Sequence, residues 1–235
     1  MQRFALKYIG NILALSCLLF LAACSSGGGQ PPQAQITPTP TAAATPTPVV
    51  PAGTVLYQAD WSKGLASWTG SKGWTIVDGN AQSDTSKNDA LIIPYTPIDP
   101  NYEVDYRFQI VEVPQSGASF FLQGIQSKDK DGYEAGVLNL LQPGASSEFG
   151  NPQIQIEIDP TGDMERPVQP ADYEPGNGWH TFRVKIQESE AIFYTDALRK
   201  GDVFSSRTDF LTNGPIQLVS TGVEVRVSSI TITAL

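Results

Sequence analysis

The chain contains few residues that could build a disulfide-based or metal-based site. It has two cysteines and a single histidine, His180. Cys17 lies in an apolar N-terminal segment that we expect to be removed, so the mature chain could form no internal disulfide. One histidine excludes a site with several histidine ligands. A Cys–His dyad is excluded as well, because Cys24, the remaining cysteine, is assigned to another role below.

Positive charge is also scarce. The sequence has 15 Lys and Arg against 24 Asp and Glu, which gives a net charge of −9. Without Arg3 and Lys7, which belong to the N-terminal segment, the net charge would fall to −11. Nucleic-acid binding requires a basic surface, so nucleic acid is excluded as a partner. An acidic surface is compatible with solubility outside the cell and with a bound cation.

Residues 1–23 have the organisation of a signal peptide. A short basic start with Arg3 and Lys7 precedes an apolar run from Ile12 to Ala23. The uncharged span Tyr8–Ala23 has 16 residues, which is short of the roughly 20 that a membrane-spanning helix needs. We therefore expect export and removal of this segment, and an uncleaved membrane anchor is the alternative.

The end of that segment, Leu21-Ala22-Ala23-Cys24, resembles the bacterial lipobox. The resemblance implies cleavage before Cys24 and attachment of a diacylglyceryl group to its sulfur. Two acyl chains hold a protein stably in a lipid bilayer. The expected localisation is lipid-anchored, with the domain on the extracytoplasmic side of the membrane. Ordinary secretory cleavage nearby is the alternative.

Residues 24–53 form a low-complexity stretch of Gly and Ser followed by Thr-Pro repeats. It has too few large apolar side chains to offset its conformational entropy, so we expect a disordered linker. The Thr-Pro pairs favour extended polyproline II, which suits a stalk or a simple spacer. The folded domain is then expected over residues 54–235.

From Thr54 onward the pattern is that of an all-β protein. The clearest strand is 102–113, where Tyr102, Val104 and Tyr106 alternate with charged residues. Helical periodicity is absent, and turn residues separate the strands, which predicts an antiparallel two-sheet sandwich or jelly roll. The remaining strands are expected at 55–59, 74–77, 90–93, 119–126, 133–141, 153–158, 179–187, 191–196, 215–219 and 223–233.

Four segments together resemble the concanavalin A-like lectin/glucanase superfamily of jelly rolls. They are the acidic-aromatic opening Tyr57–Trp68, the strand and turn Gly73–Gly79, the long strand Tyr102–Ile110, and Gly178–Val184 with its Trp-His-x-Phe-Arg-Val order. Their order and spacing cover nearly all of 54–235. The resemblance implies the sandwich fold, and it raises three types of site: glucanase, calcium and sugar.

A glucanase site requires paired carboxylates. The first two acids of the family motif Glu-x-Asp-x-x-Glu match Glu157 and Asp159. The third acid would fall on Gly162, and Pro160 interrupts the strand. Glu157 and Asp159 are therefore weak catalytic candidates. The incomplete motif favours a domain without catalysis.

A structural Ca²⁺ is implied by the resemblance at Asp60, which stands where the first ligand would be. The partner acid near the C-terminus is replaced by Ser229. Residues 127–132 share the start of an EF-hand loop, but position 12 is Leu138, so a hairpin turn is expected there instead.

A sugar-binding face needs planar polar side chains and aromatic rings. The ligand-binding candidates are Gln123, Tyr133, Gln155 and Glu157 on strands, with Trp68 and Tyr173 near loops. Trp74 and Trp179, inside expected strands, are predicted to lie in the core. A lone strand histidine such as His180 is more often a hydrogen-bonded structural residue than a ligand.

Three functions remain open from the sequence. The preferred one is a lipid-anchored jelly roll that binds carbohydrate or another extracellular ligand without catalysis. The second is a structural or protein-interaction module with no small ligand. The third is an enzyme that acts on sugar polymers, which would depend on Glu157 or Asp159.

Overall fold

The computed structural model describes most of the chain from Val50 onward. The described residues are 50–70, 72–86, 88–99, 101–127, 130–146, 150–158, 170–188, 190–204 and 214–235. The signal peptide 1–23, Cys24 and most of the linker 24–53 lie outside them, so these expectations stay predictions. Where the chain is described, it forms β-strands and one short 3-10 segment, η1 (Trp61–Lys63), and contains no helix long and apolar enough to cross a membrane.

Sheet A contains eight antiparallel strands. In spatial order they are β13 (Leu198–Phe204), β12 (Glu190–Thr195), β11 (Trp179–Gln187), β6 (Asn101–Glu112), β15 (Glu224–Ala234), β4 (Asn80–Gln82) and β3 (Thr75–Val77), and β1 (Val55–Gln58) also pairs with β15. The first and last strands of the domain therefore belong to the same sheet.

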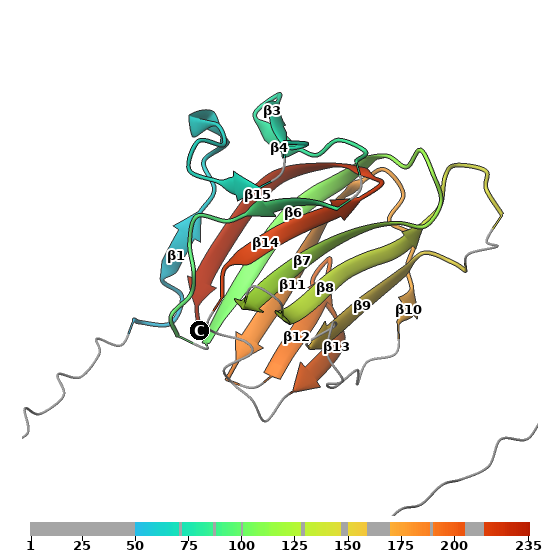
Figure 1. Ribbon diagram of the computed structural model, residues 1–235. Helices are drawn as coiled ribbons and strands as arrows, with labels where there is room; N and C mark the ends of the chain where they lie inside the picture. The colour runs from blue at the N-terminus through green and yellow to red at the C-terminus, as the bar shows by residue number, and fades with distance from the viewer. Residues whose placement is uncertain are drawn as a thin grey trace, which may run out of the picture. The chain divides into compact units, whose positions relative to one another are not determined.

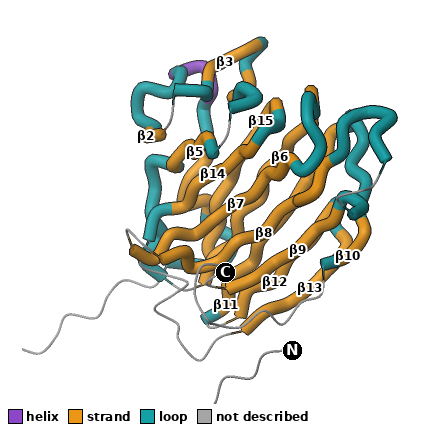
Figure 2. The backbone as a smooth tube through the Cα atoms, turned by 45° about the vertical axis from the view of Figure 1, so that its right-hand side comes forward, coloured by secondary structure: helices purple, strands orange, loops and turns teal. Residues whose placement is uncertain are grey.

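Sheet B contains seven antiparallel strands. In spatial order they are β10 (Ala171–Asp172), β9 (Gln153–Ile158), β8 (Lys130–Leu140), β7 (Ala118–Ser127), β14 (Ile216–Thr221), β5 (Asp89–Ile92) and β2 (Thr69–Gly70). The two sheets lie face to face (Figure 1), and loops join the strands of both layers at their ends (Figure 2). The predicted all-β, two-sheet antiparallel sandwich is confirmed.

The core lies between the sheets because each long strand alternates apolar and polar side chains. On β6, Tyr106 and Phe108 are fully buried, while their neighbour Arg107 is exposed. The ring of Phe108 lies 5.1 Å from that of Phe120 on β7 and 4.7 Å from that of Phe182 on β11. Aromatic contacts therefore join the two sheets at the centre of the domain.

Most strands were predicted, including the short strands β1, β3 and β5, and four were not. The expected strands 102–113, 119–126, 153–158 and 179–187 correspond to β6, β7, β9 and β11. The sequence analysis missed β2, β4, β10 and β13. The first three have only two or three residues, which is too short for an alternating pattern. In β13, the run Arg199-Lys200-Gly201 interrupts the alternation of apolar and polar residues by which a strand is recognised.

Tight hairpins connect several neighbouring strands. The predicted hairpin at 127–132 is confirmed, but its strands extend further than expected, because Ser127 pairs with Lys130. Two other hairpins use two-residue turns with both residues at positive φ. Asp78 and Gly79 have φ of 49° and 73° between β3 and β4, and Asp196 and Ala197 have 49° and 66° between β12 and β13. Such turns match the twist of the strands they join.

Candidate functional site

Planar polar side chains form a continuous row across the outer face of sheet B. Gln217 on β14 lies opposite Gln123 on β7, and Gln123 lies opposite Glu134 on β8. Glu134 in turn lies opposite Glu157 on β9. These positions alternate with buried residues such as Leu122, so their side chains point away from the core. The four residues Gln217, Gln123, Glu134 and Glu157 are named the Gln–Glu row below.

Hydrogen bonds between neighbours fix the orientation of this row. Gln217 Nε2 donates to Gln123 Oε1 at 2.7 Å, and Gln123 Nε2 donates to Glu134 Oε2. Each amide keeps a second N–H and a further lone pair for other partners. A hydroxyl group both donates and accepts, so a polyhydroxylated ligand is chemically suited to this row.

Gln123 and Glu157 were predicted from the sequence as ligand-binding candidates, whereas Glu134 and Gln217 were not. The signal for Glu134 was available, since Tyr133 and Ala135 on either side of it are inward-facing. Gln217 is 94 residues from Gln123 in the chain. Only the pairing of β14 with β7 brings these two residues together.

A second row on the same face runs beside the Gln–Glu row. Gln155 on β9 lies opposite Gly136 on β8, which lies opposite Phe121 on β7. A Cβ at Gly136 would stand 2.1 Å from the Phe120 carbonyl oxygen and 2.8 Å from Phe121 Cδ1. The glycine therefore leaves space for the Phe121 ring to lie close to the sheet. Three predicted ligand-binding candidates, Gln123, Gln155 and Glu157, thus share one face.

The other strand candidate, Tyr133, points to the opposite side of sheet B. Its side chain has no exposed surface, and its hydroxyl lies 3.4 Å from that of Tyr102. Gly124 makes room for the ring, because a Cβ there would stand 2.4 Å from Tyr133 Cε1. Burial raises the pKa of the Tyr133 hydroxyl well above its usual range. Tyr133 is therefore a core residue that no ligand on this face can reach.

Trp68 belongs to an aromatic cluster near the start of the domain. Its ring centroid lies 4.9 Å from that of Trp61 and 6.1 Å from that of Tyr57. The residue is half-buried and packs against the core. It lies on a segment remote in sequence from the Gln–Glu row, and its ring is engaged in packing.

Asp60, the predicted calcium ligand, caps η1. Its Oδ1 accepts hydrogen bonds from the backbone N–H and the hydroxyl of Ser62, and its Oδ2 lies 3.1 Å from Lys63 Nζ. The hydrogen bond from Ser62, followed by Lys63, lowers the pKa of Asp60. The Trp61 indole N–H donates to the Ser228 carbonyl on β15 at 3.0 Å, so Trp61 makes a direct contact between η1 and β15. Within the described residues, no group of three potential metal ligands is present.

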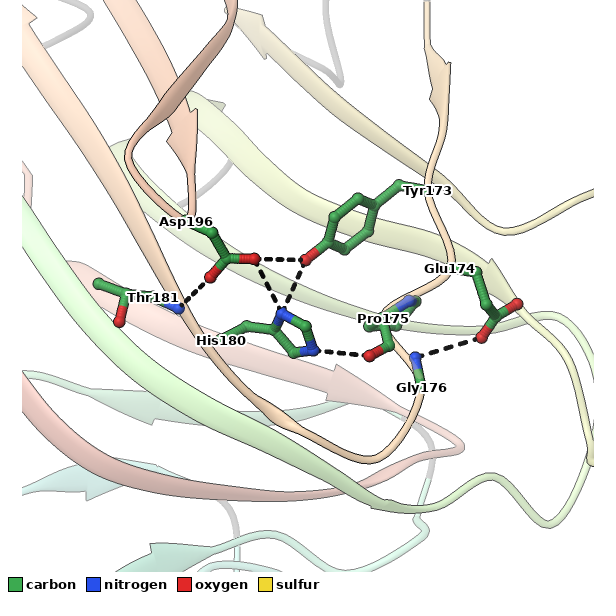
Figure 3. Close-up of polar contacts among 7 residues, drawn as sticks. All are labelled: Tyr173, Glu174, Pro175, Gly176, His180, Thr181 and Asp196. Carbon is green, nitrogen blue, oxygen red and sulfur yellow. Dashed lines mark hydrogen bonds and ion pairs between the residues drawn. The ribbon is translucent and has the colours of Figure 1, made fainter.

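Tyr173, the remaining candidate, is held in a polar cluster with His180 and Asp196 (Figure 3). His180 Nδ1 lies 2.9 Å from the Tyr173 hydroxyl and 3.0 Å from Asp196 Oδ2. His180 Nε2 lies 2.6 Å from the Pro175 carbonyl oxygen. The Thr181 backbone N–H donates to Asp196 Oδ1 at 2.9 Å. The histidine is hydrogen-bonded on both ring nitrogens, as predicted for a structural residue.

This cluster fastens the segment that leads into β11. Partial burial opposes ionisation of Asp196, but the hydrogen bonds from His180 and from the Thr181 N–H outweigh it and hold its pKa below the ordinary 3.8. Burial, followed by the charge of Asp196, raises the pKa of Tyr173 far above neutral pH. Asp196 is therefore an ionised acceptor, and Tyr173 is a protonated donor.

The fastened segment forms one wall of a depression at the end of the sandwich. The depression has a volume of about 720 Å³. Its lining includes Glu112 at the end of β6, Gln142 after β8, and Glu174 and Asn177 from the segment before β11. Among the described residues its lining contains no aromatic ring, and the depression lies beyond the Leu140 end of β8.

The glucanase motif is only partly described. Glu157 lies on the outer face of β9, whereas Asp159 and Gly162 fall outside the described residues. The carboxylate nearest to Glu157 in the strand register is Glu134, which the motif does not include.

The two tryptophans predicted to be in the core have different positions. Trp74 is 5% exposed, which confirms the prediction, although it precedes β3. For Trp179 the prediction is wrong. It shares the parity of Thr181 and Arg183 on β11, which face outward, while Phe182 faces inward. Trp179 therefore lies half-buried on the outer face of sheet A, with the Arg107 guanidinium 4.4 Å above its ring.

Comparison with known proteins reveals relatives by structure only. No protein-family model matches the sequence. No curated protein matches it either. Solved structures, in contrast, match over about three quarters of the chain.

Three of these structures illustrate the likeness. The Ca²⁺-bound exoplasmic/lumenal domain of VIP36 has a TM-score of 0.52 and 11% identity, over 72% of this chain and 83% of that one. The carbohydrate recognition domain of Emp46p has a TM-score of 0.51 and 14% identity, over 74% of this chain and 91% of that one. A Bacillus subtilis protein of unknown function with a galectin-like fold has a TM-score of 0.51 and 13% identity, over 78% of this chain and 97% of that one. At these identities the likeness shows the fold alone, and the chain thus has the jelly-roll fold of lectin domains.

Proposed function

We propose that this chain is a non-catalytic glycan-binding domain, exported and held to a membrane by lipid on Cys24. The observation that carries the binding proposal is the Gln–Glu row on sheet B. Gln217, Gln123 and Glu134 are oriented by hydrogen bonds to one another before any ligand arrives, which lowers the entropic cost of binding. The amides can also exchange hydrogen bonds with sugar hydroxyls, and Glu134 and Glu157 can accept hydrogen bonds from them.

The structural relatives support the ligand class. The VIP36 domain is described as mannose-bound in another of its structures, which has a TM-score of 0.52. The Bacillus subtilis carbohydrate-binding module CBM66 has a TM-score of 0.50 and 11% identity, over 72% of this chain and 96% of that module. These proteins use the same fold for carbohydrate, and the Gln–Glu row gives this chain suitable chemistry on one sheet.

The binding proposal is tested by a glycan array followed by calorimetric titration with the best ligand. Gln123→Ala removes the centre of the row, and we expect at least a tenfold weaker Kd, which corresponds to about 1.4 kcal/mol. Gln187→Ala, an exposed glutamine on sheet A, is the matched control and should bind as the wild type does. Equal affinity of the wild type and Gln123→Ala, or an array without any ligand, would refute the proposal.

The anchoring proposal is tested separately, by expression of the full chain in a bacterium fed with labelled fatty acid. Wild-type protein should carry the label and stay with the membrane fraction. Cys24→Ser should lose both properties. A labelled Cys24→Ser variant, or an unlabelled wild-type protein, would contradict lipid attachment at Cys24.

One observation favours a second candidate, hydrolysis of sugar polymers. Glu134 and Glu157 lie directly opposite each other, and glycoside hydrolysis requires two neighbouring carboxylates. An enzyme would release new reducing ends from a bound polymer, and Glu157→Gln would bind the polymer without cleaving it. Unchanged polymer after prolonged incubation with wild-type protein would leave binding as the function of this face.

A further inference from the structure

Sheet A carries an arginine that has no acidic partner in the described part of the chain. Arg107 projects from β6 and is exposed, and its Nη1 donates to Ser228 Oγ at 3.3 Å. Its neighbour in the sheet, Arg183, is different. Arg183 donates through Nε and Nη2 to both oxygens of Asp105, at 2.7 Å and 3.0 Å. The charge of Arg183 is therefore compensated, and that of Arg107 is left for a ligand.

The guanidinium of Arg107 is also held in place. It lies 4.4 Å above the Trp179 ring, a cation–π contact that restricts the long side chain. The contact to Ser228 fixes it from the other side. Its Nε and Nη2 remain as donors, and two donors of one guanidinium match the two oxygens of a carboxylate.

A hollow opens beside this arginine. Thr181 lies directly opposite Arg107 in the strand register. It lines a hollow of about 430 Å³ on the outer face of sheet A, together with Asp105, Arg183, Tyr194, Asp196 and Ala197. This volume falls within the roughly 300–1,000 Å³ that is typical of small-molecule sites.

The two acids in the hollow are already engaged. Both carboxylate oxygens of Asp105 accept hydrogen bonds from Arg183. Asp196 Oδ1 accepts a hydrogen bond from the Thr181 N–H, and Asp196 Oδ2 is hydrogen-bonded to His180. The hydroxyls of Thr181 and Tyr194 and the ring of Tyr194 remain to contact a polar ring. The hollow thus offers hydroxyl and aromatic contacts at Thr181 and Tyr194. Its two carboxylates and Arg183 are already paired, and the adjacent Arg107 has no acidic partner among the described residues.

We propose that the outer face of sheet A binds a sugar acid, such as a hexuronate unit of an acidic polysaccharide. The carboxylate is held by Arg107, and the sugar ring lies in the hollow between Thr181 and Tyr194. Trp179 acts as a positioning residue for the guanidinium. This site lies on the opposite sheet from the Gln–Glu row and does not depend on it.

The test uses polygalacturonate and its methyl ester, titrated into the protein at about 0.15 M salt, where charges beyond about 8 Å are screened. Wild-type protein should bind the acid form at least ten times more tightly than the ester, which has lost the charge. Arg107→Gln should bind the acid form about tenfold more weakly, or about 1.4 kcal/mol. Lys185→Gln removes another cation from the same face of sheet A, on β11, and should bind as the wild type does.

Several results would overturn the proposal. Arg107→Gln should leave the melting temperature unchanged, because the side chain is exposed. Unchanged affinity of this folded variant would refute the role of Arg107. Equal losses in Arg107→Gln and Lys185→Gln, or equally tight binding of polyphosphate, would indicate nonspecific attraction of polyanions. Gln123→Ala should retain polygalacturonate binding, so failure of the sheet B site and failure of the sheet A site can be told apart.

Discussion

Replacing Ala197 by glycine is expected to stabilise the domain. Ala197 stands at the second position of the Asp196-Ala197 turn with a φ of 66°, a left-handed conformation that a Cβ disfavours. The turn between β3 and β4 has the same geometry with glycine at the equivalent position, Gly79, at a φ of 73°. The chain therefore contains both versions of one turn, and each can be converted into the other.

The magnitude follows from two opposing terms. A left-handed conformation costs a residue with a side chain about 1–2 kcal/mol. Glycine offsets part of this gain, because it adds about 0.4–1 kcal/mol of conformational freedom to the unfolded chain. We expect Ala197→Gly to raise the free energy of unfolding by about 1 kcal/mol, and Gly79→Ala to lower it by a similar amount. No atom lies within 4 Å of a Cβ built at Gly79, so steric clash does not contribute there.

The assay is thermal and urea unfolding of the wild type and both variants. A change of about 1 kcal/mol corresponds to roughly 2–4 °C in Tm for a domain of this size. Opposite shifts in the two variants are the expected result. If Ala197→Gly lowered the Tm, or if Gly79→Ala left it unchanged, the backbone conformation would not be what determines the cost, and the reasoning would be wrong.

Three further predictions concern other parts of the fold. Gly136→Ala places a Cβ 2.1 Å from the Phe120 carbonyl oxygen, so urea unfolding should show a loss of about 2 kcal/mol or more; a loss below 0.5 kcal/mol, the size of an ordinary surface change, would contradict this contact. Asp196→Asn should destabilise the domain near neutral pH. Because the folded pKa of Asp196 is lowered, that contribution is present above its ordinary value of 3.8 and disappears as the pH falls through the folded pKa. Unfolding curves of both proteins should therefore converge in acid, and a constant difference would refute the assignment. EDTA should leave the Tm unchanged, because Ser62 and Lys63 already occupy the oxygens of Asp60; a fall that Ca²⁺ reverses would establish a metal site.

The architecture could be predicted because alternation along a strand is local information. On β6, five buried apolar residues from Tyr102 to Ile110 alternate with polar ones, and this pattern alone fixes which face packs inward. The prediction for Trp179 did not use this rule and relied on the general preference of tryptophan for the core. The parity of Trp179 differs from that of Phe182, three residues away, and the buried Phe182 decides the orientation of the strand. Parity was therefore a better guide than the general preference of tryptophan for the core.

The two proposed binding surfaces depend on strand register, which the sequence does not reveal. The Gln–Glu row joins residues from four strands, and Arg107 meets Thr181 only because β6 pairs with β11. The candidates Gln123 and Glu157 were identified by residue type, but their partners were not. Tyr133 was misplaced for the complementary reason, since a tyrosine in a strand can face either side and its neighbour Gly124 accommodates the ring.

The pairing at the beginning of the domain determines how the fold carries mechanical load. Gly53 N–H donates to the Ala234 carbonyl at 2.8 Å, Ala234 N–H donates to the Thr54 carbonyl at 2.9 Å, and β1 continues this contact along β15. A pull on the chain before Gly53 is therefore resisted first by the β1–β15 seam. β15 is in turn bonded to β6 along most of its length. Tension applied through the N-terminal segment would therefore act on β15 and β6 of sheet A before it reaches sheet B.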